Sequence, residues 1–524
     1  MGINRTTQSL LAALVLLAAA FGIAEADQPT AVSASGPGAG ATPLHAQVQT
    51  SSLVCPPPQG TSSASTRYAL TAPGPAPDAT SNAAAGSEPD SAALTPVAAA
   101  GAGAGKPLAT LGSPGGQTTA KAAAGSAAVS ADGSGRLAPG LTVEQTTTSS
   151  RALTGTACTA PGTDFWFAGT SAAQGRADRL LLTNTESVAA SVSVQLFGPD
   201  GEADNTTAAD LTVQPGSTLD QSIGKLVNGA INSTDLAAHV MVHSGRVAAS
   251  LYADDGSSGA DWIPATQAGS TVTVPGLPGD TKDARLIVAD PGEEDADLKV
   301  QLASQTGWIT PAGHETVHVS AGSATVVDLG AVTHGQPATL RLSPSGASGA
   351  VPVVAGVRVG RGSDESWLGG SAAVGARATV AGLQSGATLL LTASGPAASV
   401  KLDFSGAGGK TVQIQPGATT AVPVPSGATA ATLTPSSPAV YAARLQTASG
   451  GLFTLQPLPY DRSAVTVPAP TRTRKPPRSS APAPPRPDRS AEGASKGRGA
   501  RSSAAPPRGR AQRHRPDRSA EGAS

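Results

Sequence analysis

Residues 179–201 read "RLLLTNTESVAASVSVQLFGPDG", and this stretch indicates the fold. An apolar run is followed by a polar turn, after which apolar and small polar residues alternate as far as Phe197 and end at a glycine. Strict alternation is typical of a strand that buries one face, and bounding turn residues favour a hairpin. The stretch therefore predicts two antiparallel strands.

The same layout occurs twice more, at 285–307 and 389–409. The first strands begin at Leu180, Leu286 and Leu389, a spacing of about 100 residues, which is the size of an immunoglobulin-like sandwich. Solenoid repeats are shorter, typically about 20–50 residues, so separate small domains are expected. The sequence predicts an all-β chain of tandem antiparallel β-sandwiches. We place them at 151–275, 276–380 and 381–467, with joints at 274–280 and 378–386.

Aromatic residues outline the expected folded part. All four tryptophans lie between residues 150 and 377, Tyr68 is the only Phe, Trp or Tyr from 27 to 150, and no Phe, Trp or Tyr follows Tyr460. Large rings dominate core burial, so residues 27–150 are expected to be mostly disordered, with edge strands near 51–57 and 141–148. The Arg- and Pro-rich residues 468–524 are expected to form a disordered tail.

The amino terminus has the features of a secretion signal over residues 1–26. Arg5 precedes an apolar run at 10–24, and Ala24-Glu25-Ala26 offers a cleavage pattern. The run is shorter than the roughly 20 residues of a spanning helix, so removal is favoured over anchoring. We expect a secreted protein, associated with the cell envelope and without a membrane contact after signal removal.

The two cysteines, Cys55 and Cys158, are expected to form one disulfide, as is usual for an exported chain with an even count. A metal or redox pair is the alternative, although such pairs favour C-x-x-C spacing.

Net charge is −1, but it is unevenly distributed. Residues 471–524 carry a balance of +10, and the remainder carries −11. An acidic body is not expected to bind nucleic acid. The tail, which repeats "RPDRSAEGAS" at 486–495 and 515–524, is either a low-complexity extension or a basic arm for anionic polymer.

His314-Glu315-Thr316-Val317-His318 matches the H-E-x-x-H pattern of zinc peptidases. The pattern needs a helix to bring both histidines to one metal. Glycines at 313 and 322 leave too little length for one, and the repeat aligns this stretch with strand-turn sequences. His314, Glu315 and His318 are therefore weak metal candidates. We expect no catalytic residues and no cofactor.

Three other stretches have alternative interpretations. His239 and His243 are four residues apart on an expected strand, which favours a packed or solvated face over a metal site. The acidic residues 290–297 lack a calcium-loop register, so a solvated turn is favoured. The rings at 163–169 suggest either a ligand platform or, as we favour, core.

The chain resembles the secreted actinobacterial proteins of domain-of-unknown-function family 5719. The resemblance covers residues 51–467 and is carried by "CTAPGTDFWFAG" (158–169), "LTNTESVAASVSVQLFGPDG" (182–201), "DWIPA" (261–265) and "ADLKVQLASQTGWITPAGHETVHV" (296–319). It implies export and a β-rich body. It implies no catalytic residues, because the family has no established activity.

These observations predict a non-enzymatic structural or binding module at the cell envelope, with wall glycan or an envelope protein as its expected partner. The alternatives are a zinc-dependent hydrolase that uses 314–318, and an accessory factor in envelope-polymer assembly.

Overall fold

The computed structural model describes residues 44–74, 89–99, 105–203, 210–227, 234–346, 349–458, 460 and 462–467. The chain divides into two units, Met1–Ala469 and Pro470–Ser524, and every described residue belongs to the first. The expected signal segment 1–26 and basic tail 468–524 lie outside the described residues. The statements below concern the first unit alone.

The alternating pattern of the sequence becomes burial on one face of a strand. In β12 (Ala190–Gly198), Val192, Val194 and Leu196 are buried, whereas Ser193 and Gln195 are partly exposed. Side chains two apart on a strand share a face, so the three apolar residues enter one core together. The prediction of an all-β chain of tandem antiparallel sandwiches is confirmed.

The described residues contain four sandwiches rather than three. The first has sheets in the strand orders β2-β7-β4-β5 and β6-β3-β8-β9. Its strands are β2 (Thr50–Cys55), β3 (Ser65–Thr71), β4 (Ser91–Pro96), β5 (Ala109–Leu111), β6 (Gln117–Ala123), β7 (Val129–Ser134), β8 (Thr142–Thr148) and β9 (Leu153–Ala157), with a 3-10 turn at Gly135–Leu137.

The second sandwich has sheets in the orders β10-β16-β12-β13, with β14 also on β12, and β15-β11-β17-β18. Besides β12, it comprises β10 (Asp164–Thr170), β11 (Arg179–Asn184), β13 (Gly201–Glu202), β14 (Leu211–Val213), β15 (Ser217–Ser222), the short helix α2 (Ile223–Leu226), β16 (Leu236–Ser244), β17 (Ala248–Asp254), a 3-10 turn at Gly256–Ser258, and β18 (Ala260–Ile263).

The third sandwich has sheets in the orders β19-β25-β21-β22, with β23 also on β21, and β24-β20-β26-β27. Its strands are β19 (Val272–Leu277), β20 (Asp283–Ala289), β21 (Ala296–Ser304), β22 (Gly307–Ile309), β23 (Thr316–Val319), β24 (Ala324–Asp328), β25 (Ala338–Pro344), β26 (Val354–Arg361) and β27 (Asp364–Gly369).

The fourth sandwich has sheets in the orders β28-β33-β30-β31 and β32-β29-β34-β35. Its strands are β28 (Ala378–Val380), β29 (Thr388–Ala393), β30 (Ala398–Phe404), β31 (Gly408–Ile414), β32 (Thr419–Pro423), β33 (Ala431–Pro435), β34 (Val440–Thr447) and β35 (Phe453–Pro457), with a 3-10 turn at Ser449–Gly451. Leaving out the extra strands β14 and β23, all four sandwiches share one topology. Strands 1-6-3-4 form one sheet, and strands 5-2-7-8 form the other.

The expectation of disorder at 27–150 is wrong for the described part of that region. Residues 120–135, which look too rich in Ala and Gly to fold, contribute to β6 and β7. Their core is built from small residues at alternating positions, such as Ala92 and Ala131, around Tyr68 and Leu94. The stretch at 141–148 is not an edge strand either, since β8 lies between β3 and β9.

The expected domain boundaries also need correction. β9 (Leu153–Ala157) lies in the range 151–275 but completes the first sandwich. The expected joint at 274–280 overlaps β19, the first strand of the third sandwich, and the joint at 378–386 overlaps β28. Pro275 is accommodated in β19 because β19 is an edge strand, where a proline is tolerated.

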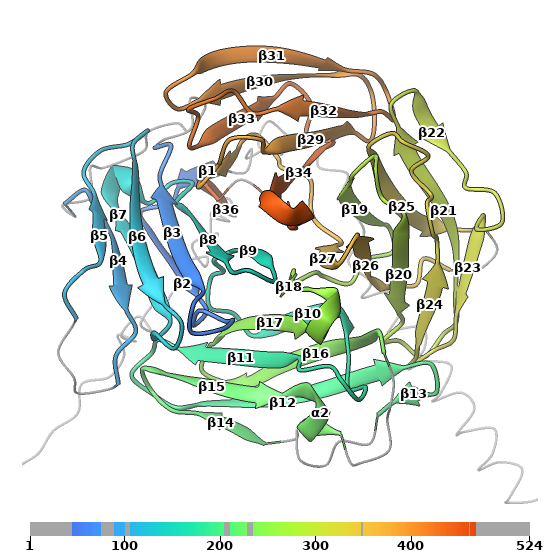
Figure 1. Ribbon diagram of the computed structural model, residues 1–524, viewed down its shortest axis with the longest axis horizontal. Helices are drawn as coiled ribbons and strands as arrows, with labels where there is room; N and C mark the ends of the chain where they lie inside the picture. Colours follow the sequence, from blue (N-terminus) through green and yellow to red (C-terminus); the bar gives the residue numbers. More distant parts are fainter. Residues whose placement is uncertain are drawn as a thin grey trace, which may run out of the picture. The chain divides into compact units, whose positions relative to one another are not determined.

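The four sandwiches follow one another around a common centre, where their last strands meet (Figure 1). β9 contacts β18, β18 contacts β27, β27 contacts β35, and β35 contacts β9. Each is an edge strand of its own sheet, so the four cover one another's exposed edges. β1 (Leu44–Gln47) pairs antiparallel with β36 (Ala464–Val467), which joins the two ends of this ring.

The last strands also pack into neighbouring cores. Trp367 of β27 belongs to the core of the second sandwich, and Phe453 and Leu455 of β35 belong to the core of the third. Burying a large side chain contributes about 1.5–3 kcal/mol, so these residues hold neighbouring sandwiches together.

Candidate ligand-binding site

The H-E-x-x-H stretch is a turn followed by a strand. The N–H of His314 donates to the carbonyl of Pro311, and β23 contains His318 but neither His314 nor Glu315. His318 is exposed, and its Nδ1 lies 2.9 Å from Asp297 Oδ1. The hydrogen bond to Asp297 raises the pKa of His318. The described residues contain no group of three or more His, Cys, Asp or Glu side chains arranged to hold a metal ion.

The second histidine pair lies on β16. His239 stacks on Trp166, with ring centroids 3.8 Å apart, and its Nε2 is 3.3 Å from Asp164 Oδ2. Burial lowers the pKa of His239. His243 shares a hydrogen bond of 2.8 Å with the Ser193 hydroxyl. Each ring thus has its own partners.

The acidic residues 290–297 form the turn between β20 and β21 and the first two residues of β21. Asp290 accepts the N–H of Gly292 in its own turn, and Asp295 accepts the N–H of Ala321. Asp297 accepts from His318 when that ring is protonated at Nδ1. Asp290 and Asp295 therefore bind backbone N–H groups of turns, and Asp297 pairs with a residue of the neighbouring strand β23.

The aromatic stretch at 163–169 forms β10, and its rings are core. Phe165 and Phe167 enter the core of the second sandwich. Trp166 points to the opposite face, where it packs with Phe197 and with Ile287 of the third sandwich. With 9% or less of each ring exposed, the three do not form an open platform.

Cys55 and Cys158 form a disulfide, as predicted. It links the end of β2 to the residue that follows β9, and these strands belong to opposite sheets of the first sandwich. The bond therefore cross-links one sandwich internally.

A buried group of four residues, which we call the central hub, connects the four last strands. Asp261 of β18 accepts the N–H of Gly155 in β9 at 2.8 Å and the hydroxyl of Ser366 in β27 at 2.5 Å. Ser366 Oγ in turn accepts the N–H of Leu455 in β35 at 2.9 Å. Asp261 and Ser366 are fully buried, and burial raises the pKa of Asp261 to about 8.

A cavity of about 410 Å³ borders this hub, and we call it the axial cavity. Its walls come from the segments that leave the four last strands. These segments are 158–160 after β9, 264–271 after β18 and 370–372 after β27, together with Leu458, Tyr460 and Arg462 after β35. The hydroxyl of Thr266 donates to the carbonyl of Gly370 at 2.8 Å, so two of these segments are tied directly together. Because the last strand of each sandwich lies at the centre, the four segments that follow these strands converge there.

The wall of the axial cavity is mainly uncharged. Three rings line it, from Phe165, Trp262 and Tyr460, of which Tyr460 is 52% exposed. The charged residues among the described lining are Asp164 and Arg462. The hydroxyl and amide residues are Thr156, Thr159, Thr266, Gln267, Thr271, Thr273, Ser371 and Gln456.

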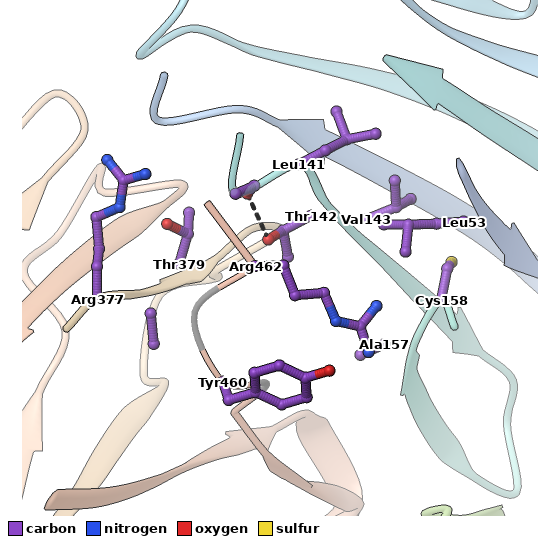
Figure 2. A pocket seen from close by; sticks show the side chains of 12 residues that line it. Leu53, Leu141, Thr142, Val143, Ala157, Cys158, Arg377, Thr379, Tyr460 and Arg462 are labelled. Carbon is purple, nitrogen blue, oxygen red and sulfur yellow. Dashed lines mark hydrogen bonds between the residues drawn. The ribbon is translucent and has the colours of Figure 1, made fainter. Parts of the chain in front are cut away.

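A second, much smaller pocket lies between the first and fourth sandwiches (Figure 2). It shares Ala157, Cys158, Tyr460 and Arg462 with the axial cavity. Figure 2 shows the Arg462 side chain extending toward Ala157, with the Tyr460 ring beside it. The guanidinium carbon of Arg462 lies 5.2 Å from the centre of that ring. A volume of about 20 Å³ has room for about one water, so the axial cavity is the site for a larger ligand.

Sequence reasoning does not find the axial cavity. The one available signal is that two of the sequence repeats end in similar segments, "DWIPA" (261–265) and "SWLGG" (366–370). Residues of both segments line the cavity. Trp262 borders the cavity, whereas Trp367 is fully buried in the second sandwich. No described helix is long and apolar enough to cross a membrane.

Residues 117–425 match the sequence model described as "Family of unknown function (DUF5719)". The match covers more than half of the chain, so the chain belongs to this family. No curated protein matches the chain.

Proposed function

We propose that this member of a family of unknown function is an exported, non-enzymatic binding module of the cell envelope, and that its ligand occupies the axial cavity. The observation that carries the proposal is the cavity itself. Its volume of about 410 Å³ falls in the range of ligand sites, roughly 300–1,000 Å³. Ligand sites also typically combine aromatic side chains with polar groups that fix the ligand's orientation, and this wall has both.

The frame around the cavity supports recognition of a ligand. The central hub links all four last strands through buried hydrogen bonds. Rigid elements hold a site more precisely than loops alone, so less ordering entropy is lost on binding. Loops on a rigid scaffold are a common place for binding residues.

Two observations support export. The predicted signal at 1–26 has the charge, apolar run and cleavage pattern of a secreted protein. The Cys55–Cys158 disulfide fits an oxidising compartment, where such bonds persist. Export together with the rigid frame supports a structural or binding role at the envelope.

The proposal is tested by measuring whether a substitution that fills the cavity abolishes ligand binding. Ala265 and Ala268 are exposed residues in the cavity wall, so Ala265→Trp or Ala268→Trp fills the space without disturbing the core. Val188, which is 58% exposed and outside the cavity lining, gives the matched control Val188→Trp. The probe is the soluble fraction of an envelope digest, with bound molecules identified by native mass spectrometry of the full chain.

We expect a bound species with the wild type and with Val188→Trp, and its loss with Ala265→Trp. Equal binding by all three proteins would place the ligand elsewhere. Absence of any bound species from digests of polymer, peptide and lipid would overturn the binding role.

A further inference from the structure

The chemistry of the axial cavity indicates a class of ligand. The described residues of its wall include many hydroxyl and amide groups but only two charged side chains, Asp164 and Arg462. Asp164 is already paired with His239, and Arg462 lies against the Tyr460 ring. A phosphorylated or strongly acidic ligand needs several cations, which this wall does not supply.

Several polar groups of the wall have no hydrogen-bond partner among the described residues. They are Thr159 Oγ1, Trp262 Nε1, Ser371 Oγ, Gln456 Nε2 and Arg462 Nε. A buried group that makes no hydrogen bond loses its bonds to water without a replacement, so an unpartnered group in a native protein calls for an explanation. The nitrogen atoms are all donors and the hydroxyls can donate, so the missing partner is rich in acceptor oxygens.

Gln456 shows how the fold orients one of these donors. Its Oε1 is bound by the buried guanidinium of Arg444, which assigns the amide orientation. The Nε2 group therefore has no hydrogen-bond partner, and it is covered by Gly155, where an added Cβ would lie 2.9 Å from it. Both residues line the cavity, and Gln456 itself is 4% exposed.

Tyr460 supplies an exposed aromatic surface beside these polar groups. Its ring is half exposed at the cavity wall, whereas Phe165 and Trp262 are buried within it. An exposed ring beside hydroxyl and amide groups suits a ligand that has both an apolar face and hydrogen-bonding edges. A sugar ring has both, since its C–H bonds form flat faces and its hydroxyls lie around the edge.

We propose that the axial cavity binds a short stretch of neutral glycan, with a sugar ring on Tyr460 and sugar oxygens accepting from Ser371 and Thr159. This inference rests on the proposed function and names its ligand class. The covered donors in the wall gain their partners when side chains such as Ser371 and Thr159 rotate toward the bound sugar.

The experiment is calorimetric titration of the full chain with neutral di- to tetrasaccharides and with sulfated or uronic-acid counterparts of the same length. We expect the neutral series to bind and the acidic series to bind at least about tenfold more weakly. Tyr460→Ala should weaken binding about tenfold, and Tyr460→Phe should retain it because the ring remains.

Ser371→Ala gives a second, independent readout. Since the Ser371 hydroxyl has no partner in the free protein, its removal should leave thermal stability unchanged or raised while affinity falls about threefold or more. A purely structural role for this hydroxyl would instead lower stability.

The possible failures are distinguishable. Preferred binding of acidic saccharides, or binding of peptides or lipids from the digest that Ala265→Trp blocks, would overturn the neutral-glycan inference and leave the binding module standing. If Ala265→Trp affects no ligand at all, both proposals fail.

Discussion

The carboxylate of Asp261 in β18 and the hydroxyl of Ser366 in β27 are 2.5 Å apart, and this one contact connects the hydrogen bonds of all four sandwiches. Gly155 donates to Asp261, and Leu455 donates to Ser366. Both side chains are fully buried, so water does not compete for these bonds. The central hub therefore holds the strands that border the axial cavity.

Because of Asp261, the four-sandwich unit should be more stable to unfolding in mild acid than at pH 8. Burial raises its pKa in the folded chain to about 8, against about 3.9 in the unfolded chain, so the folded state binds the proton more tightly. Its stabilising contribution is complete below about pH 4 and is lost as pH rises through 8. Asp261→Asn keeps acceptors for Gly155 and a donor for Ser366 but does not titrate.

The measurement for Asp261 is the free energy of unfolding by urea at pH 5, 6, 7 and 8. The wild type should lose stability with rising pH by up to about 1.4 kcal/mol per unit relative to Asp261→Asn. Burial also raises the pKa of Asp364 and Glu365, but these titrate in both proteins and cancel in the comparison. Parallel pH profiles would show that Asp261 does not titrate as stated.

Glu144 and Arg444 should act as one unit at the junction of the first and fourth sandwiches. They are buried with 3.5 Å between charged atoms, and Arg444 also donates to the carbonyl of Ala381. Removing one partner of a buried ion pair typically costs about 3–5 kcal/mol, because the other charge is left unpaired. Glu144→Gln and Arg444→Met should each cost this much, and the double variant should cost clearly less than their sum.

A double-mutant cycle by chemical denaturation measures that coupling. The exposed pair Arg179–Asp220 is the control, and its cycle should give about 1 kcal/mol or less. Additive costs at Glu144 and Arg444 would mean that the two charges do not stabilise each other.

Gly417→Ala should loosen the contact between the third and fourth sandwiches. Gly417 has φ +67°, and a Cβ there would lie 2.3 Å from the ring of Trp308. Gly427 has φ +84° with no atom within 4 Å of an added Cβ, so Gly427→Ala carries the backbone strain alone. We expect both variants to lose about 1 kcal/mol, and Gly417→Ala to lose a further 1–3 kcal/mol. Thermal unfolding of both variants checks this, and equal losses would contradict a steric role for Trp308.

Replacing both cysteines should destabilise the first sandwich. The Cys55–Cys158 bond closes a loop across 103 residues, for which chain entropy gives about 4–5 kcal/mol. Denaturation of the Cys55→Ser/Cys158→Ser variant and of the reduced wild type, each compared with the oxidised wild type, measures this cost. Little loss of stability in the variant and in the reduced wild type would show that contacts with the neighbouring sandwiches already hold the first sandwich together.

Zinc content tests the H-E-x-x-H stretch directly. Because His318 lies on a strand and pairs with Asp297, we expect zinc at background in protein purified without chelator, with no change in His314→Ala. Elemental mass spectrometry gives the answer. Near-stoichiometric zinc that disappears in His314→Ala would favour the hydrolase alternative.

The sequence by itself determined the fold class and much of the local structure. The alternation at 190–196 predicts β12 because the period of a strand places every second residue in the core. The repeated layout predicts tandem sandwiches, and the cysteine count predicts the disulfide. These features depend on local periodicity or on the count of one residue type, which a single sequence contains.

Only the tertiary structure decided that there is a fourth sandwich and that all four meet at a centre. Residues 120–135 look too poor in apolar surface to fold, yet their alanines pack because a second sheet and a disulfide lie against them. The hub bonds of Asp261 join residues 106 and 105 positions away, and no local pattern encodes such pairings. The axial cavity exists because four chain exits converge, which is a property of their arrangement in space.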